Sequence, residues 1–457
     1  MSNQRVIIIG AGLAGSLLAI FLAKRGIQVD VFEARGDMRK EQVAAGRSIN
    51  LALSDRGIAA LRQVGMDEFM LAEAMPMRGR MIHSVDGSTK LLPYSGRKGE
   101  YINSVSRAGL NIALMNEAEK YPGVQFIFGE RCTDFDCKYG EVTFEGGRTL
   151  RSDTVIATDG AGSQVRQAMQ RQIAEFEFSS EFLEHGYKEL VIPPASELPE
   201  MPEGASPRSG NFLLEPNALH IWPRHKFMMI ALPNFDGSFT CTLFLSHNGN
   251  GEAGFDQLVD DAALLNFFQR EFPDAVRLMP SLVEDFFANP TGSLGTIKCW
   301  PWNVGGRSLL LGDAAHAIVP FYGQGMNCAF EDVRVLDSLI EKHGVAWESI
   351  YKEYGALRKI NTDAIADLAV GNFYEMRDAT ADPVFQRKRE LETLLEQNYT
   401  DYFSKYSMVT FREDIPYSVA LSKGNAQDRL LMEICSKTHD ALELDLGSIA
   451  AQLKEAG

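Results

Sequence analysis

The hydrophobic positions of residues 6–33 predict a strand, a helix and a second strand in quick succession. Residues 6–9 are an unbroken run of β-branched side chains, which is typical of a buried strand. Apolar residues then recur at helical spacing over 13–25, and Gly26 is a typical helix end. A second apolar run covers 28–32. A helix that links two strands at this spacing predicts parallel pairing with a right-handed crossover.

Helices and strands continue to alternate through the next part of the chain. Apolar residues have helical spacing over 57–74 and again over 107–120. Alternating residues with turn formers between them predict an antiparallel ribbon over 133–150. Residues 152–169 then repeat the order of a buried strand, a glycine-containing turn and a helix.

The pattern changes twice in the second half of the chain. Four short alternating runs between 187 and 247 predict an antiparallel sheet, and helical patterns follow at 255–271 and 279–288. Residues 308–313 return to the apolar run of a buried parallel strand, and a helix follows them. From 347 to the end the chain is mostly helical.

This order of elements predicts an α/β fold. It combines a Rossmann-like nucleotide-binding domain, an inserted antiparallel β-sheet domain, and a helical C-terminal region. The nucleotide-binding domain, assigned to FAD by the motifs below, is expected to be discontinuous and to join residues 1–180 to residues 290–345. The inserted sheet is expected over 181–289. The helical region is expected over 346–457 and caps the active site.

Composition narrows the function classes. The chain has 457 residues, of which 45% are hydrophobic and 23% charged, with a formal net charge of -16. Such an acidic surface repels nucleic acid and anionic membranes, so neither is expected as a partner. The six cysteines form no Cys-x-x-Cys pair, and the eight histidines have no zinc-site spacing. We therefore expect reduced thiols in a cytoplasmic protein, and no metal.

The uncharged stretch over 6–23 allows a second interpretation, because an export signal is also apolar. Three features favour a strand, a turn and a helix instead. The stretch begins with β-branched residues, and glycines follow at regular positions. It also lacks the small-residue cleavage site that closes an export signal.

The glycines of residues 10–15, Gly-Ala-Gly-Leu-Ala-Gly, lie where the first strand meets the first helix. Glycines allow a tight turn and let the backbone approach a pyrophosphate, while the helix N-terminus supplies free N–H groups. Glu33 ends the second strand, where a carboxylate can accept both hydroxyls of an adenosine ribose. The same carboxylate disfavours a 2′-phosphate, so NAD and FAD remain as the candidate dinucleotides.

A second strand-to-helix junction favours FAD. Gly312-Asp313 follows the strand at 308–313, and Asp313 can bind a ribityl hydroxyl. The helix that begins near Met326-Asn327 can direct its N-terminus at a flavin, whose pyrimidine ring becomes anionic on reduction. NAD needs one such junction, whereas FAD has a second polar region to hold. Asp159-Gly160 forms a third junction.

The three junction motifs together, GAGLAG, ATDG and LLLGDAAH, resemble those of the single-component FAD-dependent aromatic hydroxylases. Arg107 stands where that family places an FAD-contacting arginine. Five further stretches, at 44–57, 77–83, 215–224, 320–332 and 405–411, are similar to the kynurenine 3-monooxygenase branch of the family. They are spread over almost the whole chain.

The resemblance implies an activity. Members of this branch hydroxylate L-kynurenine to 3-hydroxy-L-kynurenine with NADPH and O₂, through a flavin C4a-hydroperoxide. FAD is expected to stay bound, and NADPH to bind transiently as a cosubstrate. The reaction belongs to tryptophan catabolism and NAD biosynthesis. A homodimer is compatible with this resemblance.

The resemblance also implies site residues. The residues implied for FAD are Gly10, Gly12, Leu13, Ala14, Gly15, Glu33, Arg35, Ala52, Arg107, Cys132, Asp159, Asp313, Gly325, Met326 and Asn327. Those implied for the amino-acid substrate are Arg80, Tyr94, Asn372 and Tyr406, with the arginine suited to a carboxylate. The loop with Pro320, Phe321 and Gly325 is expected beside the substrate ring, and the role of Tyr322 there stays open. Candidates for the ring wall, each also a typical core residue, are Trp222, Phe239, Phe244 and Met376.

No side chain is assigned as a general base, because the flavin carries the oxygen chemistry. Two other functions remain open from the sequence. One is an FAD monooxygenase for a different aromatic acid or amino-aryl ketone, which would share the FAD motifs. The other is a non-catalytic flavoprotein that senses redox state. An amino-acid-binding set of arginine, tyrosines and asparagine disfavours the second.

Overall fold

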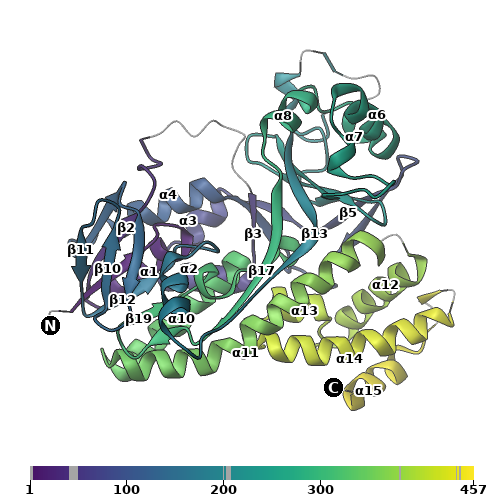
Figure 1. The fold of residues 1–457 in the computed structure, drawn as a ribbon. Helices are drawn as coiled ribbons and strands as arrows, with labels where there is room; N and C mark the ends of the chain where they lie inside the picture. Colours follow the sequence, from purple (N-terminus) through teal and green to yellow (C-terminus); the bar gives the residue numbers. More distant parts are fainter. Residues whose placement is uncertain are drawn as a thin grey trace.

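The computed structural model describes residues 4–40, 50–198, 200–201, 207–379, 382–438, 440–441 and 444–456. Figure 1 shows an N-terminal α/β region, a large twisted sheet beside it, and a group of C-terminal helices that lies along both. This arrangement confirms the expected α/β fold. Residues 44–49, part of one stretch that carried the resemblance, lie outside the described residues.

The N-terminal region is built on a six-stranded sheet. Its central strand pairs in parallel with a neighbour on each side, so that Val6 lies opposite both Val29 and Thr154. Residues Val6 to Ile9 are almost fully buried, as their branched apolar side chains predict. In order across the sheet, the strands are β18 (Asn303–Val304), β19 (Ser308–Leu310), β12 (Thr154–Ala157), β1 (Arg5–Ile9), β2 (Gln28–Glu33) and β8 (Val124–Phe128).

This topology brings the three junction motifs together. Strands β19, β12 and β1 are neighbours and run in parallel, so their carboxyl ends lie at one edge of the sheet. The turns that start at Gly10, Thr158 and Gly312 therefore lie side by side, although Gly10 and Gly312 are far apart in the sequence. Ligands bind at this edge in open parallel sheets.

The second large sheet has seven strands and is wider than the segment 181–289 in which it was expected. Two of its strands come from the N-terminal part of the chain, and its outer strand follows that segment. It is also mixed and not wholly antiparallel, because β14 pairs in parallel with β5. In order, the strands are β17 (Gly292–Trp300), β13 (Glu177–Ile192), β16 (Phe239–Ser246), β15 (Met228–Pro233), β14 (Leu219–Pro223), β5 (Gly79–His83) and β6 (Thr89–Pro93).

The described residues also form two three-stranded sheets. The ribbon expected over 133–150 has three strands, β9 (Cys132–Asp136), β10 (Glu141–Phe144) and β11 (Thr149–Arg151). The other small sheet joins the two large ones and consists of β3 (Asn50–Leu53), β7 (Ile102–Ser106) and β4 (Met75–Met77).

The helix expected over 57–74 is in fact two helices, because Gly65 has a φ of 75° that a helix does not accommodate. The helices before residue 345 are α1 (Leu13–Lys24), α2 (Asp55–Gln63), α3 (Asp67–Ala72), α4 (Arg107–Ala118), α5 (Gln164–Gln172), α6 (Asp261–Glu271), α7 (Pro273–Val276), α8 (Leu282–Ala288), α9 (Asp313–His316) and α10 (Gly325–His343). One face of the seven-stranded sheet packs against α6, α7 and α8, and the other faces the C-terminal helices.

The C-terminal region is helical, as expected. It consists of α11 (Trp347–Tyr374), α12 (Pro383–Asn398), α13 (Lys405–Thr410), α14 (Tyr417–Ser436) and α15 (Leu446–Ala456), and α11 runs on into one turn of π-helix at Glu375–Ala379. A search of the described residues for helices with the length and apolar character of a bilayer span finds none.

Buried charges dock this region onto the α/β region. The guanidinium of Arg56 on α2 pairs with Glu331 on α10 at 3.1 Å and donates to the carbonyl of Val409 on α13 at 2.9 Å. Arg358 on α11 pairs with Asp332 on α10, with 2.6 Å from Nε to Oδ1. Breaking one partner of such a pair leaves an uncompensated buried charge, which is strongly destabilising.

A second buried polar cluster lies on the outer side of the seven-stranded sheet. His83 Nδ1 lies 2.7 Å from Asp274, and His83 Nε2 lies 2.8 Å from Nδ1 of His220. The other ring nitrogen of His220 donates to the carbonyl of Glu215 at 2.9 Å, and the indole of Trp222 donates to Asp274. Burial lowers the pKa of His220 to about 3, because the charged ring would lose its water and face His83.

This shift predicts that the protein loses stability in mild acid. Below pH 6.5 the unfolded chain protonates His220 while the folded chain does not, so the free energy of unfolding falls as pH falls. From this group we expect a slope of up to about 1.4 kcal/mol per pH unit between roughly pH 6 and 4.5. Thermal unfolding of wild type and His220→Gln across that range measures it. A wild-type slope no steeper than that of the variant would contradict the assignment, and His225→Gln, which changes an exposed histidine, is the control.

Candidate functional site

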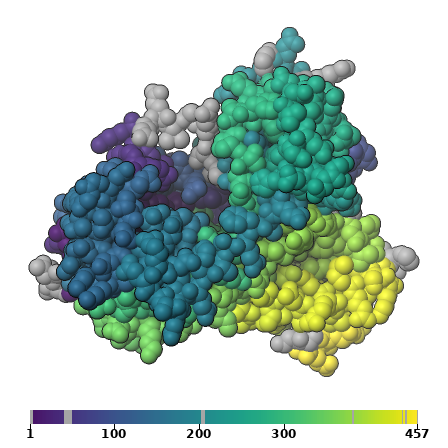
Figure 2. All heavy atoms as spheres, in the orientation of Figure 1, coloured from purple at the N-terminus to yellow at the C-terminus, as the bar shows by residue number. Residues whose placement is uncertain are grey.

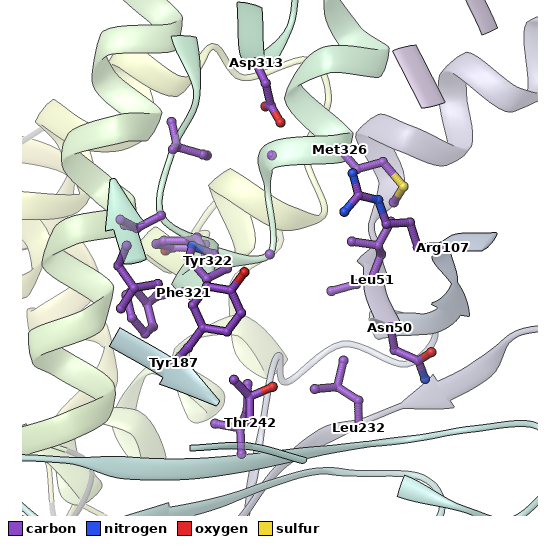
Figure 3. A pocket seen from close by; sticks show the side chains of 18 of the residues that line it. Asn50, Leu51, Arg107, Tyr187, Leu232, Thr242, Asp313, Phe321, Tyr322 and Met326 are labelled. Atoms are coloured by element: carbon purple, nitrogen blue, oxygen red, sulfur yellow. The ribbon is translucent and has the colours of Figure 1, made fainter. Parts of the chain in front are cut away.

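A cavity of about 470 Å³ lies where the α/β region, the seven-stranded sheet and the C-terminal helices meet. Figure 2 shows a hollow on this face, between the N-terminal region in purple and blue and the sheet with its helices in teal. Figure 3 shows side chains converging on it, with Asp313 and Met326 on one side and Tyr187 and Thr242 on the sheet side. The C-terminal helices add Met376 and Tyr406 to the lining.

The turn between β1 and α1 forms one end of the cavity. Gly12, Leu13 and Ala14 line it, and no side chain in the described part of the chain caps the N-terminus of α1. Gly10 has a φ of 102°, which only glycine adopts readily. A Cβ on Gly15 would lie 2.1 Å from the carbonyl oxygen of Gly10, whereas a Cβ on Gly12 would meet nothing within 4 Å. Gly15 thus serves close packing, and Gly12 leaves room for a ligand.

Glu33 stands beside this turn and is buried. One carboxylate oxygen accepts the backbone N–H of Ala11 at 2.9 Å, and the other accepts the backbone and side-chain N–H groups of Arg35. Burial alone would raise the pKa of Glu33, but these hydrogen bonds outweigh it and hold the pKa below its ordinary value. The ionised carboxylate has lone pairs left for ribose hydroxyls and also holds the turn in shape.

We expect Glu33→Ala to weaken retention of a bound dinucleotide by about tenfold or more. The variant loses acceptors for the ribose and releases the Ala11 N–H, each a charge-assisted hydrogen bond of about 1.5–3 kcal/mol. The fraction of flavin that remains after dialysis measures the effect. Glu130→Ala, a carboxylate on a neighbouring turn, serves as the control, and a fully yellow Glu33→Ala protein would remove the ribose role.

The second junction supplies Asp313 and the N-terminus of α10. The Asp313 carboxylate is exposed to the cavity, and its surroundings raise the pKa by desolvation. Gly325 and Met326 line the cavity, and no side chain caps α10. The side chain of Asn327 makes three hydrogen bonds within the protein. Its amide donates to the carbonyls of Ala52 and Gly323 at 2.8 Å each, and its oxygen accepts from Ser54, so it holds the loop together.

The remaining residues implied for FAD divide into two groups. Ala52 and Arg107 line the cavity. Asp159 caps the next turn, with one oxygen accepting the N–H of Gln164 at 2.8 Å and the other buried without a partner among the described residues. Cys132 lies outside the cavity lining and donates to the carbonyl of Asp134, and burial raises the pKa of its thiol to about 12. Its side chain is therefore a core thiol, and only its backbone is available to a cofactor.

Arg80, Tyr94 and Tyr406 come together at the closed end of the cavity. All three are buried there, one each from β5, the turn after β6, and α13. The rings of Tyr94 and Tyr406 stack at 4.9 Å, and the Arg80 guanidinium lies 5.1 Å from the centre of the Tyr406 ring. Burial raises the pKa of both tyrosines, so both hydroxyls stay protonated and can donate.

Two residues of the C-terminal helices hold Arg80 from behind. Glu375 pairs with it at 3.3 Å, and the oxygen of Asn372 accepts from it at 3.4 Å. Asn372 does not line the cavity, since its amide donates to the carbonyl of Phe321 at 2.6 Å. Burial alone would raise the pKa of Glu375, but Lys388, Arg80 and Lys405 outweigh it and lower the pKa. Sequence reasoning missed Glu375, because its partner Arg80 lies 295 residues away in the chain.

The loop at Pro320–Tyr322, which was expected beside the substrate ring, forms part of the cavity wall. Pro320, Phe321 and Tyr322 all line it, and the Tyr322 ring stacks on Tyr406 at 5.5 Å. Phe244 lies 4.8 Å from Phe321, and Met376 also lines this part. Of the four ring-wall candidates these two face the cavity, whereas Trp222 and Phe239 belong to the core on the opposite side of the sheet. Alternation along the strands alone could not tell which face was the inner one.

His316, Cys328 and Asp332 form a buried group whose ligand atoms lie within 4.8 Å of one another. Arg358 approaches two of them, at 2.6 Å from Asp332 and 3.3 Å from the sulfur of Cys328. A guanidinium thus neutralises the carboxylate, and His316 also bonds to it at 2.6 Å. We interpret the group as a charge network that supports the Gly312 turn, whose N–H bonds to Asp332.

These features fit FAD. The glycine-lined turn and the uncapped helix α1 offer free N–H groups for a pyrophosphate, next to an ionised carboxylate suited to ribose. The second junction adds the cavity-facing Asp313 carboxylate and another uncapped helix. Arg107, which makes no ion pair among the described residues, faces the same space. A single mononucleotide would leave the second junction unused.

Comparison with known proteins agrees with this geometry. Residues 3–197 and 297–369 match the FAD binding domain family. The chain is 47% identical to a kynurenine 3-monooxygenase of Myxococcus xanthus over 463 residues, which cover 99% of this chain and 96% of that protein. It is 42% identical to one from Dictyostelium discoideum, with 96% and 94% covered.

Solved structures share the fold at lower identity. The tetrameric form of 2-methyl-3-hydroxypyridine-5-carboxylic acid oxygenase superposes with a TM-score of 0.65 at 21% identity, over 86% of this chain and 98% of that one. The sequence relatives support a family assignment as well as a fold. Their similarity extends over the FAD-binding segments and over the helical C-terminal region, whose Asn372 and Glu375 contact Arg80. The chain therefore belongs to the kynurenine 3-monooxygenase family and carries its FAD-binding domain.

Proposed function

We propose that the protein hydroxylates L-kynurenine to 3-hydroxy-L-kynurenine, with bound FAD, NADPH as the transient reductant, and O₂. The observation that carries this proposal is the buried Arg80 with its two stacked tyrosines, at the closed end of a cavity whose other end meets two nucleotide-binding turns. An amino acid with an aromatic side chain matches both ends of this cavity. The kynurenine 3-monooxygenases that the chain resembles support the same substrate.

Binding begins with the substrate carboxylate. The Arg80 guanidinium presents N–H groups to it, and each charge-assisted hydrogen bond contributes about 1.5–3 kcal/mol. Burial alone would lower the pKa of Arg80, but Tyr406 and Glu375 outweigh it and keep the guanidinium charged. Glu375 and Asn372 fix its direction from behind, so that little rotational freedom is lost when the substrate binds.

The rest of the chain positions the ring and excludes water. Phe244, Phe321 and Met376 form an apolar wall next to the Arg80 site, and the loop with Pro320 closes over it. When bound, FAD would supply the chemistry that activates O₂. The amino group on the kynurenine ring makes the neighbouring ring carbon nucleophilic, so the protein needs no strong base there. We infer that its task is to hold that carbon still in a dry cavity.

The reaction can be tested directly with the purified protein. NADPH consumption is measured with and without L-kynurenine, and the product is identified by mass. The proposal requires substrate-stimulated consumption and a product heavier by one oxygen atom. Consumption without a hydroxylated product would favour another aromatic acid as substrate. Tight FAD with no stimulated consumption would favour a non-catalytic flavoprotein.

We further propose a cytoplasmic location. All six cysteines lie in described parts of the chain, and each is buried and unpaired, which is usual in a reducing compartment. Retention of the protein in the cytoplasmic fraction of its native cells would support this, and recovery from a secreted fraction would contradict it.

A further inference from the structure

Glu189 on β13 is a charged residue of the cavity wall that none of the roles above uses. Its half-buried side chain lines the cavity. Among the described residues its carboxylate has no hydrogen-bond donor and no ion pair, although its backbone carbonyl accepts from Asn289. A partly desolvated carboxylate without a partner is costly, so such a group in a cavity is suited to a ligand.

Glu189 lies too far from Arg80 to act on the same end of the substrate. Arg80 is on β5 and Glu189 on β13, which are separated by β14, β15 and β16. Four strand spacings of about 4.8 Å put them about 19 Å apart across the sheet. The Arg80 guanidinium also lies near Tyr94, on the far side from β13. Kynurenine spans roughly 8 Å from its carboxyl carbon to the far ring carbon. Glu189 therefore faces a different occupant of the cavity.

The surroundings of Glu189 are polar and lie toward the nucleotide-binding side. Thr242 is its direct neighbour on β16, and Tyr187 is the next residue of β13 with the same orientation. Figure 3 shows Tyr187 and Thr242 on the sheet side of the cavity and Arg107 across from them. Arg107 lies near enough to act on the charge of Glu189 but forms no ion pair with it. Glu189 therefore faces the part of the cavity that also holds Arg107, one of the residues implied for FAD.

We propose that Glu189, with Tyr187 and Thr242, binds the nicotinamide ring of the reducing cosubstrate beside the flavin. The carboxamide of that ring has two N–H donors for the carboxylate and a carbonyl for a hydroxyl such as that of Thr242. This inference rests on the proposed function, because it needs a nicotinamide reductant. The proposal gives that reductant a binding position. No second dinucleotide-binding motif in the sequence indicates one.

The charge of Glu189 also suits the chemistry of reduction. The C4–H bond of the dihydronicotinamide breaks, and the hydrogen leaves with both electrons for the flavin. The flavin is thereby reduced by two electrons, and the nicotinamide becomes a pyridinium cation. A carboxylate beside the ring stabilises this developing positive charge, and does so more strongly in a cavity that excludes water.

Anaerobic reduction of the holoenzyme by NADPH tests the proposal. Flavin absorbance is followed after rapid mixing, over a range of NADPH and at saturating L-kynurenine. In Glu189→Gln the acceptor is kept and the charge is lost, so we expect a reduction rate about tenfold lower with a similar half-saturation for NADPH. In Glu189→Ala both are lost, so the half-saturation should also rise by about tenfold. Glu181→Gln, an exposed carboxylate on the same strand, is the matched control.

Two separate measurements keep the result interpretable. FAD content and the half-saturation for L-kynurenine, read from the flavin spectrum, should match wild type in both Glu189 variants. Wild-type reduction rates in Glu189→Gln and Glu189→Ala would overturn the inference, and so would a change confined to L-kynurenine or FAD binding. If NADPH fails to reduce wild-type protein with L-kynurenine present, the proposed function itself fails, which is a different outcome.

Discussion

Arg80→Ala should raise the KM for L-kynurenine by about a hundredfold while FAD stays bound. The variant loses a pair of charge-assisted hydrogen bonds to the substrate carboxylate, together worth about 3 kcal/mol. It also leaves Glu375 without the partner that lies 3.3 Å away, which adds to the repulsion of an anionic substrate. Steady-state kinetics and the flavin absorbance of the dialysed protein measure the two effects.

Two further variants complete this test: one separates the planar shape of the Arg80 guanidinium from its positive charge, and the other is a control. Arg80→Lys keeps a cation but loses the planar fork, so we expect an intermediate KM. Arg78→Ala removes an exposed arginine two residues earlier, which lies over Tyr101, and should leave the KM unchanged. An unchanged KM in Arg80→Ala would remove Arg80 from the substrate site and with it the main support for an amino-acid substrate.

Gly15→Ala should abolish FAD retention and lower the thermal stability of the protein. The added Cβ would lie 2.1 Å from the Gly10 carbonyl oxygen and 2.6 Å from the hydroxyl of Thr158, so the turn or the helix must move. Overpacking of this kind costs about 1–3 kcal/mol. Flavin content after dialysis and the unfolding temperature of the apoprotein measure the outcome.

Gly12→Ala is the informative partner of this variant. Its Cβ meets no atom of the described residues within 4 Å, so the apoprotein should unfold at the wild-type temperature. Because Gly12 lines the cavity, the methyl group should still weaken FAD binding. Gly371→Ala, on an exposed helical position with free space around it, should change neither property. Equal loss of apoprotein stability in the Gly12 and Gly15 variants would refute the assignment of Gly15 to close packing and of Gly12 to space for the ligand.

Local patterns were enough to predict most elements of the fold. The strand, turn and helix at residues 5–24 match their prediction within a residue, because β-branched runs, glycines and helical spacing act over short distances. The helix over 57–74 was predicted wrongly, since helical spacing continued across Gly65 while its backbone conformation did not. The inserted sheet was predicted too narrow, because no local pattern tells which sheet β5, β6 or β17 will join.

By itself the sequence determined that this protein has three strand-to-helix junctions, since each is a contiguous strand, turn and helix. Only the tertiary structure decided which side chains share a site. Arg80 reaches Asn372 and Glu375 across almost 300 residues of chain, and the Asn327 side chain bonds to the carbonyl of Ala52, far away in the sequence. It also left Glu189 unpaired in the cavity wall. The physical reason is that sheet register and helix docking, which set these distances, depend on contacts between residues far apart in sequence.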